Sequence, residues 1–226
     1  MVAAIHGGYW RSAYDLAHLS HLCAALAAAG ISTASLEYRR LGEGEGGWPA
    51  TLQDVQRGLD ALPGLAASMG VDASRLVLLG HSAGGQLALW AASQSRQSGA
   101  LPRPSTVHPR GVVALAPVSD LAEAFRLKLS EDVVREFLGG SPAQVPKRYQ
   151  DASPLELVPL GVPTVVVHGT DDEDVPYALS TAYVKRAHAA GDEARLVTLQ
   201  GADHFDVIDP ESRFWPQVLK AVQSLV

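Results

Sequence analysis

The fold of this chain is decided by the stretch Arg75-Leu76-Val77-Leu78-Leu79-Gly80-His81-Ser82-Ala83-Gly84. Its first half is a largely apolar run, which is typical of a strand buried on both faces of a parallel sheet. Its second half matches the pattern G-x-S-x-G, and the residues from Ala83 to Ser95 predict a helix. A serine on a sharp turn has a strained backbone, and flanking glycines let neighbouring segments pass close by. The stretch therefore predicts a strand, turn and helix that present Ser82 as a nucleophile.

Strands and helices alternate along the rest of the chain, without a repeat of fixed period. Further strands are predicted at Val2–Ile5, Ile31–Leu36, Gly111–Ala116, Pro163–Val167 and Glu193–Leu199. Further helices are predicted at Asp15–Ala29, Trp48–Met69 with a kink or break at Pro63-Gly64, Tyr177–Ala190 and Ser212–Val226. This alternation implies a mostly parallel sheet flanked by helices, with functional residues at the carboxyl ends of its strands.

The length and composition indicate a single α/β domain over residues 1–226. With 47% hydrophobic and 19% charged residues, a chain of this size can form a core without disulfides or metals. The segment from Asp120 to Val158 lacks a strand pattern and contains helical fragments and scattered prolines. We therefore expect residues 119–158 to form a small lid-like insertion in the domain.

Charge and cysteine content exclude several classes of function. The formal net charge is −6, which argues against binding to nucleic acids or to anionic membranes. No stretch resembles a signal peptide, and no run of about 18 apolar residues is present. Cys23 is the only cysteine, so no disulfide can form within the chain. The expected location is the cytoplasm.

A nucleophilic serine needs a base, and the base needs a group that orients it. His204 lies in a loop after the last predicted strand, and it follows Ser82 and an acidic loop in the order Ser…Asp…His. Because this order is typical of such a nucleophile turn, we expect His204 to be the base. By contrast, His18 lies in a predicted helix, and His168 precedes the acidic loop.

The orienting acid is one of the carboxylates in the loop between His168 and Pro176. Asp172 occupies the last position of the spacing H-G-x-x-D and is the preferred candidate, with Asp174 and Asp171 as alternatives. The carboxylates of this loop that do not orient the base are expected to be solvated or hydrogen-bonded to the turn.

The loop His6-Gly7-Gly8-Tyr9-Trp10 directly follows the first predicted strand. Its paired glycines let the backbone approach a substrate closely, so the amides of Gly8 and Tyr9, joined by that of Ala83, are predicted to form an oxyanion hole. An ordinary glycine turn is the alternative interpretation of this loop.

Trp10 and Trp48 are candidates for lining an aromatic substrate pocket, although ordinary packing of large rings explains them equally well. No glycine-rich phosphate loop follows a predicted strand, and no two histidines at i, i+4 bracket an acid. Neither a cofactor nor a metal is therefore expected.

These motifs together resemble those of the α/β-hydrolase fold, and within it the carboxylesterases and the kynurenine-formamidase-like enzymes. The likeness spans essentially the whole chain. It rests on the HGGYW loop at residues 6–10, the GHSAGG turn at 80–85, the acidic loop at 168–176, Asp203-His204-Phe205, and Glu37-Tyr38-Arg39 with Trp48-Pro49-Ala50 and Asp54. Members of this group carry further strands before the HGG loop, which begins here at His6, so we expect a sheet without the usual N-terminal edge strands, either because the start is trimmed or because the fold has lost an edge hairpin. Dimerisation would be one way to cover a sheet edge exposed in this manner.

The residues and the resemblance predict a serine hydrolase that cleaves small carboxylic esters through an acyl-enzyme. The HGGYW loop and the segment ending in Phe205 look especially like arylformamidases, so hydrolysis of N-formylkynurenine is the alternative. A third hypothesis is a non-catalytic ligand-binding protein, which would be expected to have lost a residue of the site. The expected partner is a small ester or formamide, not a nucleic acid or a membrane, and a homodimer is left open.

Overall fold

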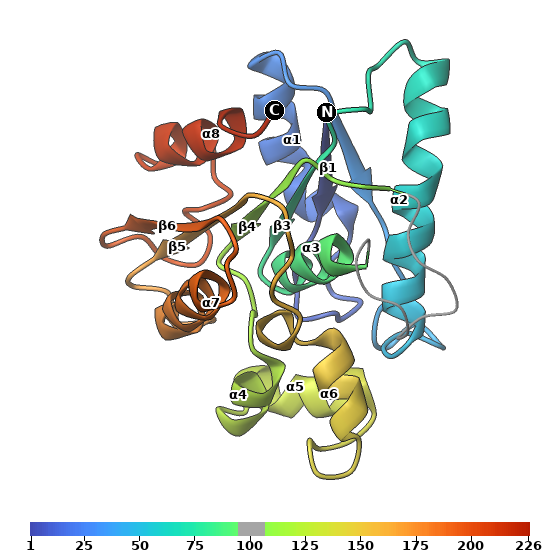
Figure 1. Ribbon diagram of the computed structural model, residues 1–226, viewed down its shortest axis with the longest axis vertical. Coiled ribbons are helices and arrows are strands. Elements are labelled where there is room, and N and C mark those ends of the chain that lie inside the picture. Colours follow the sequence, from blue (N-terminus) through green and yellow to red (C-terminus); the bar gives the residue numbers. More distant parts are fainter. Residues whose placement is uncertain (95–106) are drawn as a thin grey trace.

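A parallel sheet of six strands lies at the centre of the structure, a computed structural model that describes residues 1–94 and 107–226 (Figure 1). In chain order the strands are β1 (Val2–Ile5), β2 (Thr33–Leu36), β3 (Val77–His81), β4 (Gly111–Leu115), β5 (Thr164–Gly169) and β6 (Ala194–Leu199). Their order in the sheet is β2-β1-β3-β4-β5-β6, so β2 and β6 are the edge strands in the described part of the chain. Every neighbouring pair is parallel, which confirms the predicted α/β architecture.

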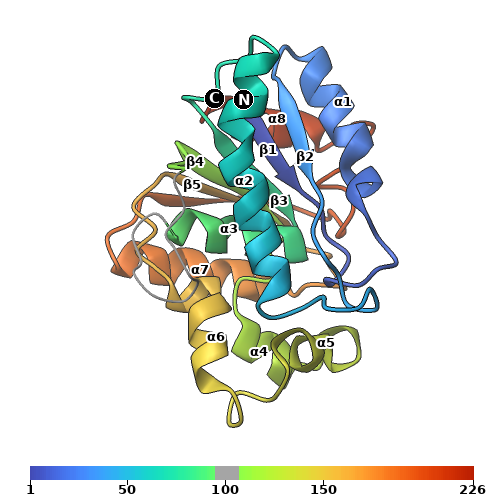
Figure 2. The ribbon, with the colours of Figure 1, turned by 90° about the vertical axis from the view of Figure 1, so that its right-hand side faces the viewer.

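Helices pack on both faces of this sheet, because a parallel sheet must bury both faces. They are α1 (Ser20–Ala28), which follows the short 3-10 helix η1 (Leu16–Leu19), α2 (Ala50–Ser68), α3 (Ala83–Ser93), α7 (Tyr177–Ala189) and α8 (Trp215–Gln223). In β1, Val2 and Ala4 join the hydrophobic cluster that α1 and α8 complete, whereas Ala3 and Ile5 join the cluster of α2, α3 and α7. Figure 2 shows α1 and α8 on one side of the sheet and α3 and α7 on the other.

The register of the strands brings the candidate functional segments to one edge of the sheet. Ile5 of β1 pairs with Gly80 of β3, and His81 pairs with Leu115 of β4. The loop that begins at His6 therefore leaves the sheet beside the turn that follows His81. Both segments lie at the carboxyl ends of their strands, which is where ligands bind in open α/β sheets.

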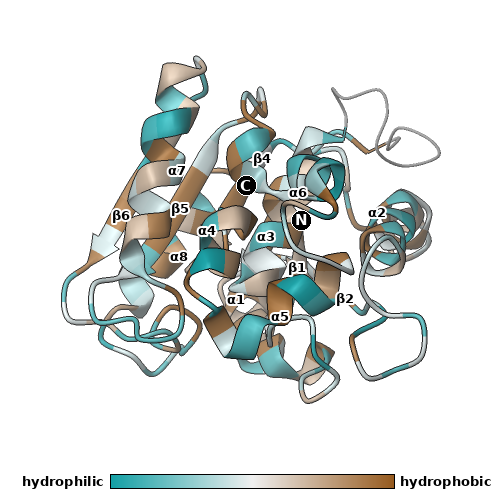
Figure 3. Ribbon diagram, turned by 90° about the horizontal axis from the view of Figure 1, so that it is seen from below, coloured by the Kyte–Doolittle hydropathy of each residue, from teal (hydrophilic) through white to brown (hydrophobic). Residues whose placement is uncertain are grey.

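Helix α2 corrects the predicted break at Pro63-Gly64, because the helix continues through Pro63 to Ser68. Its buried side chains recur at spacings of three and four residues, at Leu52, Val55, Leu59, Leu62 and Ala66. Each fully buried Leu or Val contributes about 1.5–3 kcal/mol, so together they outweigh the roughly 3 kcal/mol cost of a proline in a helix interior. Pro63 itself is exposed, and Figure 3 shows hydrophilic and hydrophobic residues on different sides of α2.

The remaining helices differ from their predicted bounds by a few residues. Helix α3 ends at Ser93, and Ser95, to which the prediction extended, lies outside the described residues. Helix α8 begins at Trp215 and ends at Gln223, inside the predicted range. Within residues 1–94 and 107–226, no helix combines the length and the apolar character needed to cross a membrane.

Residues 119–158, the predicted insertion, contain a group of short helices. These are α4 (Leu121–Arg126), α5 (Leu129–Leu138), α6 (Pro146–Ala152) and the 3-10 helix η2 (Pro154–Glu156). They lie together beyond the sheet, at the end of the molecule opposite the two chain termini (Figure 1). Their buried side chains, among them Val134 and Phe137, join the hydrophobic cluster that contains residues of α2 and α3. The insertion thus shares its core with one face of the sheet.

Candidate active site

Ser82 occupies a tight turn between β3 and α3, as the sequence predicts. Its backbone has φ 56° and ψ −119°, a sparsely populated conformation that costs about 1–3 kcal/mol. A Cβ added at Gly80 would lie 2.0 Å from the carbonyl oxygen of Gly84, and one at Gly84 would lie 2.0 Å from that of Ile5. The amide of Ser82 donates a hydrogen bond of 2.8 Å to the Leu115 carbonyl in β4. Close backbone contacts therefore hold the turn, and they require glycine on both sides of Ser82.

The amides of Gly8, Tyr9 and Ala83 make no hydrogen bond to any described residue. Gly8 has φ 98° and Tyr9 has φ 52°, so the loop after β1 turns in the left-handed region. Ala83 is the first residue of α3, where N–H groups lack an acceptor within the helix and carry the positive end of its dipole. Gly8 and Tyr9 line the same cavity as Ser82. These amides are therefore free to bind an oxygen atom beside Ser82.

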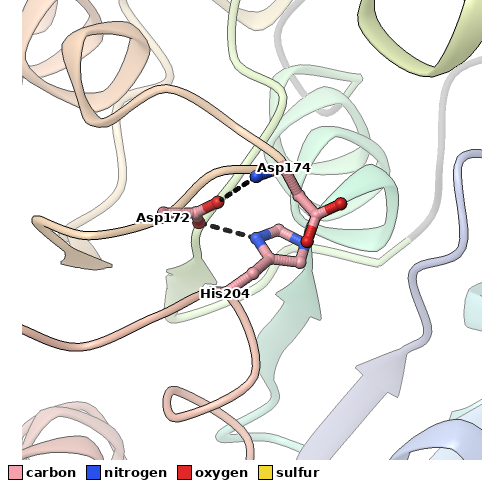
Figure 4. A group of neighbouring side chains, drawn as sticks. All are labelled: Asp172, Asp174 and His204. Atoms are coloured by element: carbon pink, nitrogen blue, oxygen red, sulfur yellow. Dashed lines mark hydrogen bonds and ion pairs between the residues drawn. The ribbon is translucent and has the colours of Figure 1, made fainter.

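His204 and Asp172 form a buried pair at the same edge of the sheet (Figure 4). Nδ1 of His204 lies 2.6 Å from Oδ2 of Asp172, and their side chains are 6% and 0% exposed. Oδ2 of Asp172 also lies 3.0 Å from Nε2 of His168, and Oδ1 accepts from the amides of Asp174 and Val175 at 2.9 and 2.7 Å. Burial raises the pKa of the Asp172 carboxyl, but the hydrogen bonds from His168 and His204 outweigh it and hold the pKa well below its usual range. Asp172 is thus an anion placed to orient the His204 ring.

The two alternative acids lie differently from Asp172. Asp171 is exposed, and its carboxylate accepts a hydrogen bond of 2.9 Å from Oγ1 of Thr170. Asp174 is also exposed, but its carboxylate points toward the edge of the His204 ring that faces away from Asp172 (Figure 4). Asp172, Asp174 and His204 each bring one potential metal ligand within 4.8 Å of the others. Both oxygens of Asp172 already accept hydrogen bonds from the loop amides and the two imidazoles, so orientation of His204 accounts for the closeness of Asp172 and His204.

Ser82 and His204 line one cavity of about 290 Å³, including its open mouth. The last residue of β3, the loops after β1, β5 and β6 and the segment around η1 supply its other walls, with Gly8, Tyr9, Tyr14, His18, His81, Asp174 and Phe205. The rings of Tyr14 and Phe205 are 40% and 46% exposed. The hydroxyl of Tyr9 donates a 2.5 Å hydrogen bond to the carbonyl of Asp174 and so joins the loop after β1 to the loop after β5. The cavity is therefore small and partly aromatic, and it carries one exposed carboxylate.

Two histidines at this cavity were not predicted as functional residues. His81 is the variable residue of G-x-S-x-G, and its Nε2 lies 3.0 Å from the carbonyl oxygen of His204. Because a carbonyl only accepts, this Nε2 carries the proton, and Nδ1 of the neutral ring accepts from Nε2 of His18 at 3.1 Å. Burial lowers the pKa of His81 well below its usual value and lowers that of His18 to about 4, so both rings are neutral. No local pattern signals these contacts, because they join segments far apart in the chain.

The structure corrects the predicted pocket residues. Trp10 is 0% exposed, stacks on Phe137 of α5 with ring centroids 4.3 Å apart, and donates from Nε1 to Gln86 at 3.1 Å. It is a core residue, because its ring fills the space between α3 and the insertion. Trp48 is half-buried against the same hydrophobic cluster and does not line the Ser82 cavity. None of the described residues that line this cavity comes from the insertion at 119–158.

Known proteins share both sequence and fold with this chain. A probable isoprenylcysteine α-carbonyl methylesterase from Oryza sativa subsp. japonica is 26% identical over 223 residues, which cover 92% of this chain and 52% of the rice protein. The chain therefore spans about half the length of that relative.

Solved structures of esterases have the same fold. Esterase B from Lactobacillus rhamnosis superposes with a TM-score of 0.83 at 21% identity, covering 99% of this chain and 74% of that one. Esterase 2 from Thermogutta terrifontis, phosphoramylated by tabun, has a TM-score of 0.78 at 22% identity, covering 99% and 80%. These likenesses establish the α/β-hydrolase fold. The family model described as BD-FAE matches residues 1–186, and this chain therefore belongs to the BD-FAE family.

Proposed function

We propose that this chain is a serine hydrolase that cleaves small carboxylic esters through an acyl-enzyme on Ser82. One observation carries the proposal: Ser82 on its strained turn and the Asp172-bound ring of His204 line a single cavity, together with Gly8 and Tyr9, whose amides are free. A nucleophile, an oriented base and oxyanion donors at one place are the groups that acyl transfer requires.

In the acylation step, Nε2 of His204 takes the proton of the Ser82 hydroxyl as its Oγ attacks the ester carbonyl carbon. The carbonyl π bond opens to an oxyanion, and Asp172 stabilises the imidazolium through Nδ1–H. When the tetrahedral intermediate collapses, the bond to the leaving alcohol breaks and the alcohol oxygen takes the proton from His204. The products of this step are the free alcohol and an ester of Ser82.

Deacylation repeats these steps with water as the nucleophile. His204 takes a proton from the water, whose oxygen attacks the acyl carbon, and the second intermediate expels Oγ of Ser82, which regains its proton from His204. The amides of Gly8, Tyr9 and Ala83 would donate to the oxyanion in both steps. Loss of one such donor typically costs about 3 kcal/mol of transition-state stabilisation.

The names of similar proteins support ester chemistry. The rice relative is named a methylesterase, and the T. terrifontis esterase has been solved with propionate bound. The same esterase has been solved phosphoramylated by tabun, an organophosphorus compound. Fluorophosphonates are also organophosphorus compounds, and a labelled one can therefore probe Ser82. The cavity of about 290 Å³ favours a substrate whose reacting portion is small.

A labelled fluorophosphonate tests the proposal directly. We expect the folded wild-type protein to be modified at Ser82, as located by mass spectrometry of its peptides. Ser82→Ala should abolish the label and lower kcat on p-nitrophenyl esters of short acids by about 10⁴-fold or more. Ser68→Ala is the matched control, because Ser68 is exposed on α2 and its hydroxyl bonds no described residue other than Leu65, through the Leu65 carbonyl. A folded wild-type protein that leaves Ser82 unlabelled would exclude the proposal.

N-formylkynurenine should be assayed beside the esters. The Asp174 carboxylate at the cavity disfavours substrates with a net negative charge, whereas N-formylkynurenine is a zwitterion whose α-ammonium this carboxylate can attract. Faster turnover of N-formylkynurenine than of any ester would assign a formamidase in place of an esterase. Binding of esters without turnover, together with an unreactive Ser82, would instead indicate a ligand-binding protein.

A further inference from the structure

His168 and Ser180 extend the Asp172–His204 pair by a buried series of hydrogen bonds, in which Ser180 contacts His168 and His168 contacts Asp172. We propose that His168 is a positioning residue, which holds Oδ2 of Asp172 in the orientation that fixes the His204 ring, and that Ser180 fixes His168 in turn. The inference rests on the proposed function, because the group that is positioned is the base for Ser82. It adds two residues from β5 and α7 to a site whose acid lies on a loop.

The hydrogen-bond partners of His168 determine which of its ring nitrogens carries a hydrogen. Its Nε2 lies 3.0 Å from Oδ2 of Asp172 and 3.0 Å from the carbonyl oxygen of Val175. Neither oxygen has a hydrogen to give, since Asp172 is an anion and a carbonyl only accepts, so Nε2 must carry one. Nδ1 lies 2.6 Å from Oγ of Ser180. Whether Nδ1 accepts from that hydroxyl or donates to it, Nε2 remains the donor to Asp172.

Burial makes this contact difficult to replace. The side chains of His168 and Asp172 are both 0% exposed, and Ser180 is fully buried as well. If leucine replaces the imidazole, the carboxylate loses one of its two imidazole donors, and the apolar side chain occupies the space in which a water could replace it. An unpaired buried charge is costly, so the carboxylate would turn toward other donors and carry His204 with it.

The origin of each group explains why His168 would matter for rate. Asp172 lies on the loop after β5, and the donors that the described residues offer to its Oδ1 are amides of that same loop, those of Asp174 and Val175. His168 belongs to β5 itself, and Ser180 belongs to the first half of α7. Their contact therefore fixes the position of the Asp172 carboxylate relative to the rigid sheet. His168 does not line the Ser82 cavity, and its action is therefore on Asp172 and not on substrate.

The test compares variants that remove or keep the donor. His168→Leu removes the N–H, whereas His168→Gln can place an amide N–H near the position of Nε2. We expect His168→Leu to lower kcat by about 10–100-fold, as for other partners of a site residue, with KM changed by less than about twofold. His168→Gln should recover most of that loss. Ser180→Ala should lower kcat by roughly 3–10-fold, whereas Thr181→Ala, its exposed neighbour on α7, should have no effect.

A second measurement requires no substrate. The Nδ1 proton of His204, bonded to a buried carboxylate, should give a far-downfield ¹H NMR signal in the wild-type protein. We expect this signal to shift or broaden in His168→Leu and Ser180→Ala, and to persist in His168→Gln and Thr181→Ala. If His168→Leu does not fold, Ser180→Ala and His168→Gln decide the question by the same two readouts.

Two results would overturn the inference. One is a folded His168→Leu or Ser180→Ala variant with wild-type kcat and an unchanged His204 signal. The other is an equal loss of kcat in His168→Leu and His168→Gln with no change in that signal, which would indicate a purely structural role. Wild-type activity in Ser82→Ala would instead overturn the proposed function, and the NMR comparison would still decide how His204 is held.

Discussion

Nε2 of His81 lies 3.0 Å from the carbonyl oxygen of His204, so the turn that carries Ser82 is tied directly to the loop that carries its candidate base. The ring of His204 is held separately, through Nδ1, by Asp172. Backbone and ring are therefore anchored by two different elements, β3 and the loop after β5. This double attachment keeps a loop histidine beside Ser82, which follows the end of a distant strand.

Asp172→Asn tests the choice of acid. An asparagine amide would donate to Nδ1 and favour the wrong tautomer of His204, so kcat on a short-chain ester should fall by about 10⁴-fold while the protein stays folded. Asp171→Asn is the matched control, because Asp171 is exposed and its carboxylate bonds no side chain other than that of Thr170 within residues 1–94 and 107–226. The kcat of this variant should stay within about twofold. A larger loss for Asp171→Asn than for Asp172→Asn would contradict the assignment.

Asp174→Asn tests the charge preference of the cavity. Its carboxylate faces the cavity beside His204, where two charges about 4 Å apart interact by about 1 kcal/mol in water. We compare a succinate monoester, which keeps a free carboxylate, with the neutral butyrate ester. Removal of the Asp174 charge should raise the ratio of their kcat/KM values, charged over neutral, by about 3–10-fold. High salt should reduce this gain, since the site is exposed. An identical ratio of the two substrates in both proteins would argue against electrostatic selection.

His18 should make the folded state pH-dependent. Burial and the neighbouring imidazoles of His6, His21 and His204 lower its pKa from 6.5 to about 4, so the unfolded chain binds more protons between these values. The free energy of unfolding should therefore be highest above pH 6.5 and fall as the pH falls toward 4. His18→Gln, which keeps a donor for His81, should show a shallower fall in urea denaturation across this range. Parallel pH profiles for the two proteins would contradict this prediction.

Gly84→Ala and Gly64→Ala should have opposite effects on stability. A Cβ at Gly84 would lie 2.0 Å from a backbone oxygen of β1, which cannot move without disturbing the sheet, whereas a Cβ at Gly64 in α2 meets nothing within 4 Å. We expect Gly84→Ala to destabilise by several kcal/mol or to prevent folding. Gly64→Ala should stabilise by about 0.5–1 kcal/mol, because alanine loses less conformational entropy in a helix. Thermal melts of the two variants provide the measurement, and a stable Gly84→Ala protein would show that the turn can relax.

Local signals were sufficient to predict the sheet and its elements. Apolar runs such as Val77–Leu79 and the glycines around Ser82 constrain the backbone over a few residues, and those constraints operate wherever the segment lies in the fold. The break predicted as one possibility at Pro63 does not occur, because the local cost of the proline is outweighed by side chains buried against other elements. The prediction was ambiguous at Trp10, because the ring packs against Phe137, far along the chain.

The sequence by itself determined the parallel α/β fold, the turn at Ser82 and the chain order that made Asp172 and His204 candidates, because each depends on nearest-neighbour chemistry and on the topology of alternating elements. Only the tertiary structure decided which acid meets His204, which aromatic rings line the cavity, and that His18, His81 and His168 surround the site. Those contacts join segments from different strands and helices. Their geometry depends on packing over the whole core, which no spacing along the chain encodes.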